Sequence, residues 1–165
     1  MKKIIILSII FLSSCWIWNN TIIMSWNTMF PTIKDKEVVE YSNNIDKLNR
    51  YDLVIIKIED NLFIKRIIWL SNEFLKIEKG NVYIKKIWEQ KFKRLDEKYL
   101  NEENYWHTKV NKDSIIYKIP KEKYFLMWDN RNYTTDSRTC FSINCNSVDI
   151  DNYINRNDIV WIIKK

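Results

Sequence analysis

The sequence predicts a mainly β fold, and three observations lead to this prediction. Short runs of β-branched and aromatic residues alternate with polar turns along most of the chain, a pattern typical of strands. A helical period of 3.6 residues is suggested only between Glu89 and Leu100. The chain has 165 residues, of which 46% are hydrophobic and 15% aromatic. These values suit one domain with its own core and exclude a disordered chain.

The N-terminus begins with Lys2 and Lys3, followed by an apolar run that ends in LSSC. A charged start before an apolar run is typical of a secretory leader. A helix of about fifteen residues would reach roughly 22 Å, short of the ~30 Å hydrocarbon core of a membrane. We expect residues 1–20 to be either a short uncleaved membrane anchor or a lipoprotein-type leader whose Cys15 carries the lipid. A buried core helix is the third interpretation. Either leader would place the rest of the chain outside the cytoplasm.

Residues 21–165 are expected to form one domain. Its predicted strands are Val38–Tyr41, Leu53–Ile58, Phe63–Leu70, Phe74–Glu78, Val82–Lys85, Ile115–Ile119, Tyr124–Met127 and Ile159–Ile163. The turn Lys79-Gly80-Asn81 contains the only glycine and should close a hairpin between two of these strands. Residues 89–113 are charged and aperiodic, so we expect an insertion or a long loop there.

The charge and the metal-binding residue types exclude several classes of partner. The net charge is +6, but the basic residues are interleaved with acidic ones, which disfavours a nucleic-acid partner and suits attraction to an anionic membrane. No metal is expected, because His107 is the only histidine and no ligand cluster accompanies the cysteines. No cofactor is expected either, since the chain lacks a phosphate-binding glycine loop. Cys140 and Cys145 are close enough in sequence for a disulfide, with two free thiols as the alternative.

Three separated motifs, SWNTMFPT at Ser25 to Thr32, FIKRIIWLSNE at Phe63 to Glu73 and FLMWDNRNYTTDSR at Phe125 to Arg138, resemble the type I signal peptidase family. A fourth segment, RYDLV at Arg50 to Val54, is also similar to that family. The motifs occur in the family's order, and the resemblance extends from about Met24 to the C-terminus. It implies a signal-peptidase-like antiparallel β-sheet or barrel catalytic domain. It also implies a membrane-bound serine-type endopeptidase that removes signal peptides from exported preproteins on the outer side of the cytoplasmic membrane.

The resemblance implies a catalytic pair made of the Thr28 hydroxyl as nucleophile and Lys65 as general base. A lysine accepts a proton only as the neutral amine, so its pKa must be lowered by burial. Lys65 suits this role because it lies in an apolar strand, with Arg66 expected on the opposite face. We predict a hydrogen bond between Lys65 and Thr28. Threonine stands where the family has serine, and its extra methyl crowds the attack; Ser25 is the alternative nucleophile.

The same resemblance implies roles for other residues near this pair. Thr134 occupies the position of a family serine that orients the lysine amine, and Asp136 is expected just behind it. The backbone N–H groups of Thr28 and Trp26 would stabilise the oxyanion. Met29 would line the floor of the substrate site. Three further charges of the last motif are interpreted as structural braces: Asp129, Arg131 and Arg138.

Glycine is almost missing from the chain, which has one Gly and eight Trp. Average usage would give roughly eleven or twelve Gly. Four of the tryptophans occupy positions where the family pattern has glycine: Trp26, Trp69, Trp128 and Trp161. Two more lie in turn-like contexts: Trp88 and Trp106. We hypothesise that the genome reads UGA as glycine and that the printed sequence reads it as tryptophan.

Two other functions fit parts of the sequence. A catalytically silent, membrane-tethered binding module with the same fold would explain the threonines at positions 28 and 134 and the missing glycines. A lysine-dyad autopeptidase of the LexA-like repressor type would share the fold and the dyad. That protein needs a DNA-binding helix-turn-helix, and the apolar leader occupies the place where it should be.

Overall fold

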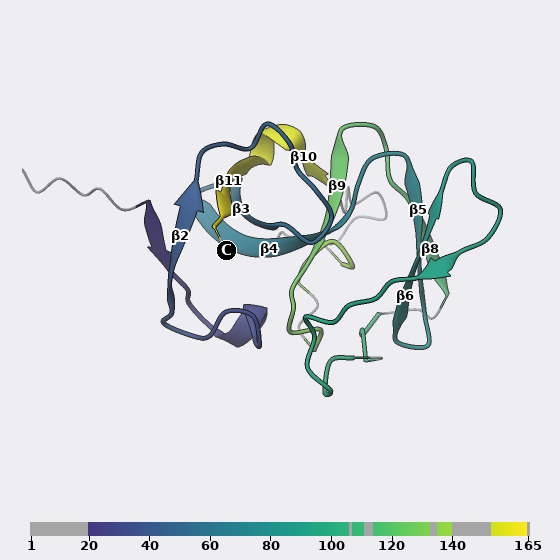
Figure 1. Ribbon diagram of the computed structural model, residues 1–165, viewed down its shortest axis with the longest axis horizontal. Helices are drawn as coiled ribbons and strands as arrows, with labels where there is room; N and C mark the ends of the chain where they lie inside the picture. Colours follow the sequence, from purple (N-terminus) through teal and green to yellow (C-terminus); the bar gives the residue numbers. More distant parts are fainter. Residues whose placement is uncertain (1–19, 106, 111–113, 133–134, 140–152, 165) are drawn as a thin grey trace, which may run out of the picture.

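The computed structural model describes residues 20–105, 107–110, 114–132, 135–139 and 153–164. Its strands form two antiparallel sheets, shown side by side in Figure 1. The larger sheet has the order β1-β2-β11-β3-β4-β9-β10, and the smaller has the order β7-β6-β5-β8. The strands are β1 Thr21–Ile23, β2 Val38–Ser42, β3 Leu53–Ile58, β4 Asn61–Trp69, β5 Glu73–Glu78, β6 Asn81–Lys86, β7 Lys93–Arg94, β8 Ile115–Lys118, β9 Lys123–Met127, β10 Ile154–Asn155 and β11 Ile159–Ile163. Two short 3₁₀ helices are η1 Asn27–Met29 and η2 Arg156–Asp158.

The larger sheet is built around the β3–β4 hairpin, and both of its faces are covered. Leu53 and Ile55 pack in one core cluster, whereas Val54 and Ile56 pack in another. Successive strand residues point to opposite faces, so a continuous apolar run indicates a strand buried on both sides. Figure 1 shows that the larger sheet is strongly curved, and β11 lies between β2 and β3 in it.

The smaller sheet packs against one end of the larger one through a shared core cluster. This cluster joins Leu75 and Ile77 of β5 to Trp69 of β4 and to Phe125 and Met127 of β9. Burial alternates along β5, as expected for a strand with one face in the core. The small sheet therefore supports the β4–β9 pair from behind.

All eight predicted strands are present, and β3 and β11 have the predicted ends. The hairpin at Gly80 is also confirmed: it joins β5 to β6, and the glycine has a φ of 74°. Three short strands, β1, β7 and β10, were not predicted, because two or three residues are too few to establish a period. The helical suggestion for Glu89 to Leu100 is wrong, since this stretch consists of β7 and turns.

Several sequence expectations lie outside the described residues. These are the leader up to residue 19 with Cys15, the orienting Thr134, and the Cys140–Cys145 pair. Within the described ranges, no helix has the length and apolar character needed to cross a bilayer.

Candidate active site

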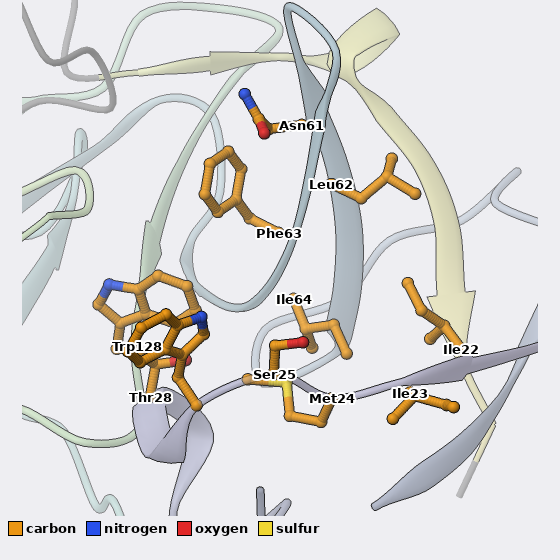
Figure 2. A pocket seen from close by; sticks show the side chains of 11 residues that line it. Ile22, Ile23, Met24, Ser25, Thr28, Asn61, Leu62, Phe63, Ile64 and Trp128 are labelled. Carbon is orange, nitrogen blue, oxygen red and sulfur yellow. The ribbon is translucent and has the colours of Figure 1, made fainter. Parts of the chain in front are cut away.

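A cavity of about 310 Å³ opens beside the first motif. Two strands flank it, and in Figure 2 the side chains of Ile22 and Ile23 from β1 and of Phe63 and Ile64 from β4 surround the same space. Its described lining residues are Ile22, Ile23, Met24, Ser25, Trp26, Thr28, Asn61, Leu62, Phe63, Ile64 and Trp128. The lining is mostly apolar, with two hydroxyls, those of Ser25 and Thr28.

Thr28 lies in the short helix η1, which directly follows the extended chain of β1. Its hydroxyl oxygen is buried and has no hydrogen-bond partner among the described residues. Its backbone carbonyl accepts a hydrogen bond from the Asn130 N–H at 3.0 Å, which ties the first motif to the last. An unsatisfied buried hydroxyl is unusual in a folded protein. Ser25, the alternative nucleophile, is exposed on the cavity wall.

Lys65 lies in the middle of β4 and is fully buried. Its Nζ donates a hydrogen bond to the Thr135 carbonyl at 2.8 Å. Burial lowers the pKa of Lys65 well below its usual value of 10.5, and the Asp136 carboxylate opposes part of that effect. A lowered pKa favours the neutral amine, which is the form a general base requires. The predicted burial of this lysine is confirmed.

The hydrogen bond predicted between Lys65 and Thr28 is not formed, since the Thr28 hydroxyl has no partner. The indole of Trp128 lies directly beside the Lys65 amine. The Lys65 Nζ lies 2.9 Å from the centroid of the Trp128 ring. The indole Nε1 also donates to the Thr135 carbonyl at 2.9 Å, the same oxygen that accepts from Lys65. Trp128 lines the cavity, and Lys65 is not among the described residues that do so.

Asp136 holds the loop that carries the Thr135 carbonyl. Its carboxylate accepts hydrogen bonds from the Trp128 N–H at 3.0 Å and from the Arg138 N–H, Nε and Nη2 at 3.0, 2.9 and 2.7 Å. Asp136 is fully buried, so this charge depends on its paired arginine. Asp136 is therefore a structural neighbour of Lys65 that also acts on its pKa.

A second buried ion pair joins the three motifs. The Arg66 Nε donates to Asp129 Oδ1 at 2.7 Å, and its Nη2 reaches Asp129 Oδ2 at 2.5 Å. The Thr32 hydroxyl donates to the same carboxylate and accepts from Arg66 Nη2 at 3.1 Å. The Arg66 partners differ from those of Lys65, as expected for neighbours on opposite faces of a strand. Thr32, Arg66 and Asp129 thus fix η1, β4 and the end of β9 relative to one another.

A third buried ion pair was missed by the sequence analysis. The Arg131 guanidinium bonds to both carboxylate oxygens of Glu97, to the Tyr99 hydroxyl at 2.8 Å and to the Thr108 hydroxyl at 3.0 Å. Its Nε donates to the Trp128 carbonyl at 2.9 Å. Residues 89–113, which were expected to be an insertion or long loop, therefore hold in place the loop after β9 that carries Arg131. No local pattern around Glu97 signals this pairing.

Two other predicted site residues have specific surroundings. The Trp26 N–H donates to Asp35 Oδ1 at 2.7 Å, so a carboxylate accepts from this amide in the structure. Its role at an oxyanion stays a prediction. Met29 is fully buried in the core cluster with Met24 and Ile33 and is not among the described residues that line the cavity. Its contact with substrate also stays a prediction.

The described residues contain no group of three or more His, Cys, Asp or Glu side chains that could hold a metal ion. The Thr28 hydroxyl and the Lys65 amine are the two groups of the motifs that can act as nucleophile and base. A neutral lysine removes a proton from a hydroxyl that attacks a carbonyl carbon.

Comparison with known proteins gives one consistent result. A family model described as "Signal peptidase, peptidase S26" matches residues 1–162. Signal peptidase I U of Bacillus subtilis (strain 168) is 27% identical over 154 residues, which are 84% of this chain and 78% of the relative. Signal peptidase I S of the same organism is 29% identical over 126 residues, 70% of this chain and 64% of the relative. This chain thus spans less than two thirds of signal peptidase I S.

The fold has a counterpart among solved structures. The crystal structure of a signal peptidase I from Enterococcus faecalis V583 superposes with a TM-score of 0.51 at 20% identity. The match covers 72% of this chain and 97% of that structure. At this identity the likeness concerns the fold, and it supports the mainly β, antiparallel architecture predicted from the sequence.

Proposed function

The chain belongs to the signal peptidase family, peptidase S26, and from this membership we propose that it is a membrane-bound endopeptidase that removes N-terminal signal peptides from exported preproteins. One observation carries the proposal: Lys65, the lysine of the second motif, is fully buried with a strongly lowered pKa, near a cavity that Thr28 lines. A buried lysine with a lowered pKa is costly to a fold and is typical of a catalytic site.

The proposed mechanism is acyl transfer to threonine. Lys65 takes the proton of the Thr28 hydroxyl while the Thr28 oxygen attacks the scissile carbonyl carbon. The tetrahedral intermediate collapses to an ester on Thr28, and the lysine returns the proton to the departing amine. Water then attacks the ester carbon and gives its proton to Lys65, which passes that proton to the departing Thr28 oxygen as the signal peptide is released. The Thr28 N–H is the oxyanion donor that the arrangement favours.

Substrate recognition by strand addition is supported by two open strand edges beside the cavity. β1 is the outer strand of the large sheet, and among the described strands it pairs with β2 alone. β4 pairs with β9 only from Arg66 onward, so the edge of residues 61–64 that would face β9 is unpaired within the described chain. An extended peptide forms backbone hydrogen bonds at such edges. Small substrate side chains would then face Thr28 across the cavity.

Membrane attachment is part of the proposal. The exposed apolar side chains of Ile23 and Leu62 line the cavity, and the exposed Val38 is the strand partner of Ile23. Exposed apolar side chains that lie close together are typical of a surface that meets a membrane or a partner. Together with the apolar leader it supports a catalytic domain lying against the outer leaflet of the cytoplasmic membrane.

Cleavage of a preprotein in lipid vesicles tests the proposal. The chain with glycine at positions 26 and 128 should convert the preprotein to its mature form; adding Lys65→Met should abolish conversion, and adding Lys57→Met at an exposed position should not. Conversion by the Lys65→Met protein would refute the role of this lysine.

A silent binding module is the second candidate function, because the Thr28–Lys65 hydrogen bond is not formed. Binding of the preprotein without conversion by any variant, including those with glycine at the tryptophan positions, would support that module.

A further inference from the structure

We propose that positions 26 and 128 are glycine in the native protein, and that the residue at position 128 decides whether Lys65 has access to the cavity. With glycine there, the space of the indole would join the Lys65 amine to the Thr28 hydroxyl. With tryptophan, the two groups are kept apart. This inference rests on the proposed function, because access of Lys65 to the cavity affects catalysis only if Lys65 is the base for the Thr28 hydroxyl.

The position of the Trp128 ring is the first support. Its centroid lies 2.9 Å from the Lys65 Nζ, and the same side chain lines the cavity that Thr28 also lines. The ring therefore stands between the amine and the cavity. Figure 2 shows Trp128 and Thr28 at the same end of this cavity. The Thr28 hydroxyl has no hydrogen-bond partner among the described residues, and Lys65 does not line the cavity. A Trp128 ring between the two groups accounts for both observations.

The backbone at Trp26 is the second and independent support. Its φ is 75° and its ψ is 157°. This combination is essentially restricted to glycine, because any Cβ clashes with the neighbouring backbone. The Trp26 side chain is 76% exposed, so no packing energy offsets the strain. The backbone before η1 therefore favours glycine at this position.

Two further tryptophans lie where strand pairing is irregular. The register of β4 against β9 shifts between Ile67 and Trp69, and the register of β11 against β3 shifts between Ile159 and Trp161. Bulges are frequent sites for glycine in strands. The buried Trp69 Nε1 also has no hydrogen-bond partner among the described residues. These positions agree with the scarcity of glycine, of which the chain has one against eight tryptophans.

Mass spectrometry of the protein isolated from its source tests the residue identity. Trypsin cuts after Lys123 and Arg131, so residue 128 lies in the peptide 124–131. A peptide mass that corresponds to glycine at position 128 is expected, and likewise for the peptide that contains position 26. Tryptophan found at either position would overturn the proposal, and this result does not depend on the folding of any variant.

Labelling of Lys65 with a water-soluble amine reagent at neutral pH tests the access. In the Trp128→Gly and Trp128→Ala proteins, Lys65 should be labelled several-fold faster than in the protein with tryptophan. Trp128→Phe keeps a ring over the amine and should label slowly. Trp88→Gly is the matched control, because Trp88 is 72% exposed in the turn after β6. Equal labelling of Lys65 with glycine, alanine and tryptophan at position 128 would overturn the proposal.

Cleavage rates distinguish failure of this inference from failure of the proposed function. A general base contributes roughly 10²–10⁴-fold to a rate, so Trp128→Gly should raise cleavage of a preprotein by about that factor. Faster labelling without any cleavage would support the access and contradict the proposed function. Trp26→Gly should raise Tm by roughly 2–12 °C through relief of backbone strain, and an unchanged Tm would contradict the assignment at position 26.

Discussion

Replacing Asp129 by asparagine should destabilise the fold strongly, because it leaves the Arg66 guanidinium buried without a counter-charge. The two side chains are 0% and 1% exposed, and asparagine keeps the shape of aspartate, so the change removes charge and creates no cavity. Breaking one side of a buried ion pair costs about 3–5 kcal/mol. In a domain of this size each kcal/mol lowers Tm by roughly 2–4 °C, which predicts a loss of roughly 6–20 °C.

Thermal unfolding followed by circular dichroism measures this loss. Glu40→Gln is the matched control, because it removes a carboxylate from an exposed pair with Lys164 and should leave Tm almost unchanged. Adding Arg66→Met to Asp129→Asn should recover part of the loss, since the unpaired charge is then removed. A Tm for Asp129→Asn equal to that of Glu40→Gln, or a double variant less stable than the single one, would refute the reasoning.

Three further predictions concern the site. In a variant with glycine at positions 26 and 128, the cleavage rate should rise with pH through the lowered pKa of Lys65 and level off well below 10.5; a rate still rising at pH 10.5 would contradict a buried base. Between the lowered pKa of Lys65 in the folded chain and 10.5, the unfolded chain binds a proton on residue 65 that the folded chain does not. The free energy of unfolding therefore falls as pH falls through this range. Lys65→Met should therefore be more stable than the unchanged chain at neutral pH, by a margin that shrinks towards pH 10.5 in chemical denaturation, and a constant margin would count against this linkage. Glu97→Gln should lower Tm and kcat while KM changes little, because it loosens the loop that Arg131 anchors; a lower Tm with an unaltered kcat would limit Glu97 to stability.

The eight strands were predictable because the apolar residues within each run already indicate a side of the strand that faces the core. Val54 and Ile56 alternate with Leu53 and Ile55, and both sets reach a core, so composition alone indicates a strand with two buried faces. The burial of Lys65 was predictable for the same reason. β1 and β10 were not, because their two or three residues acquire strand geometry only by pairing with β2 and β9.

The burial of Lys65 was predictable from the sequence, but the contacts around it were not. Glu97 and Arg131 are far apart in sequence, and their pairing depends on how the segment 89–113 packs against the end of β9. The carboxylate that binds the Trp26 amide comes from Asp35 on a neighbouring turn, which no motif encodes. The sequence analysis singled out Trp128, but its effect on Lys65 required the position of the ring. Local sequence patterns indicate which side chains are buried, whereas hydrogen bonds and ion pairs between distant residues are seen only in the folded structure.

The most direct measurement of the central claim is the initial cleavage rate of one preprotein by three variants, each with glycine at positions 26 and 128. Thr28→Ser should retain or raise the rate, since serine supplies the same hydroxyl without the crowding methyl. Thr28→Ala should abolish cleavage, and Ser25→Ala should keep it. A Thr28→Ala protein that cleaves at the full rate would contradict the assignment of Thr28, and loss of cleavage only in Ser25→Ala would transfer the nucleophile to Ser25.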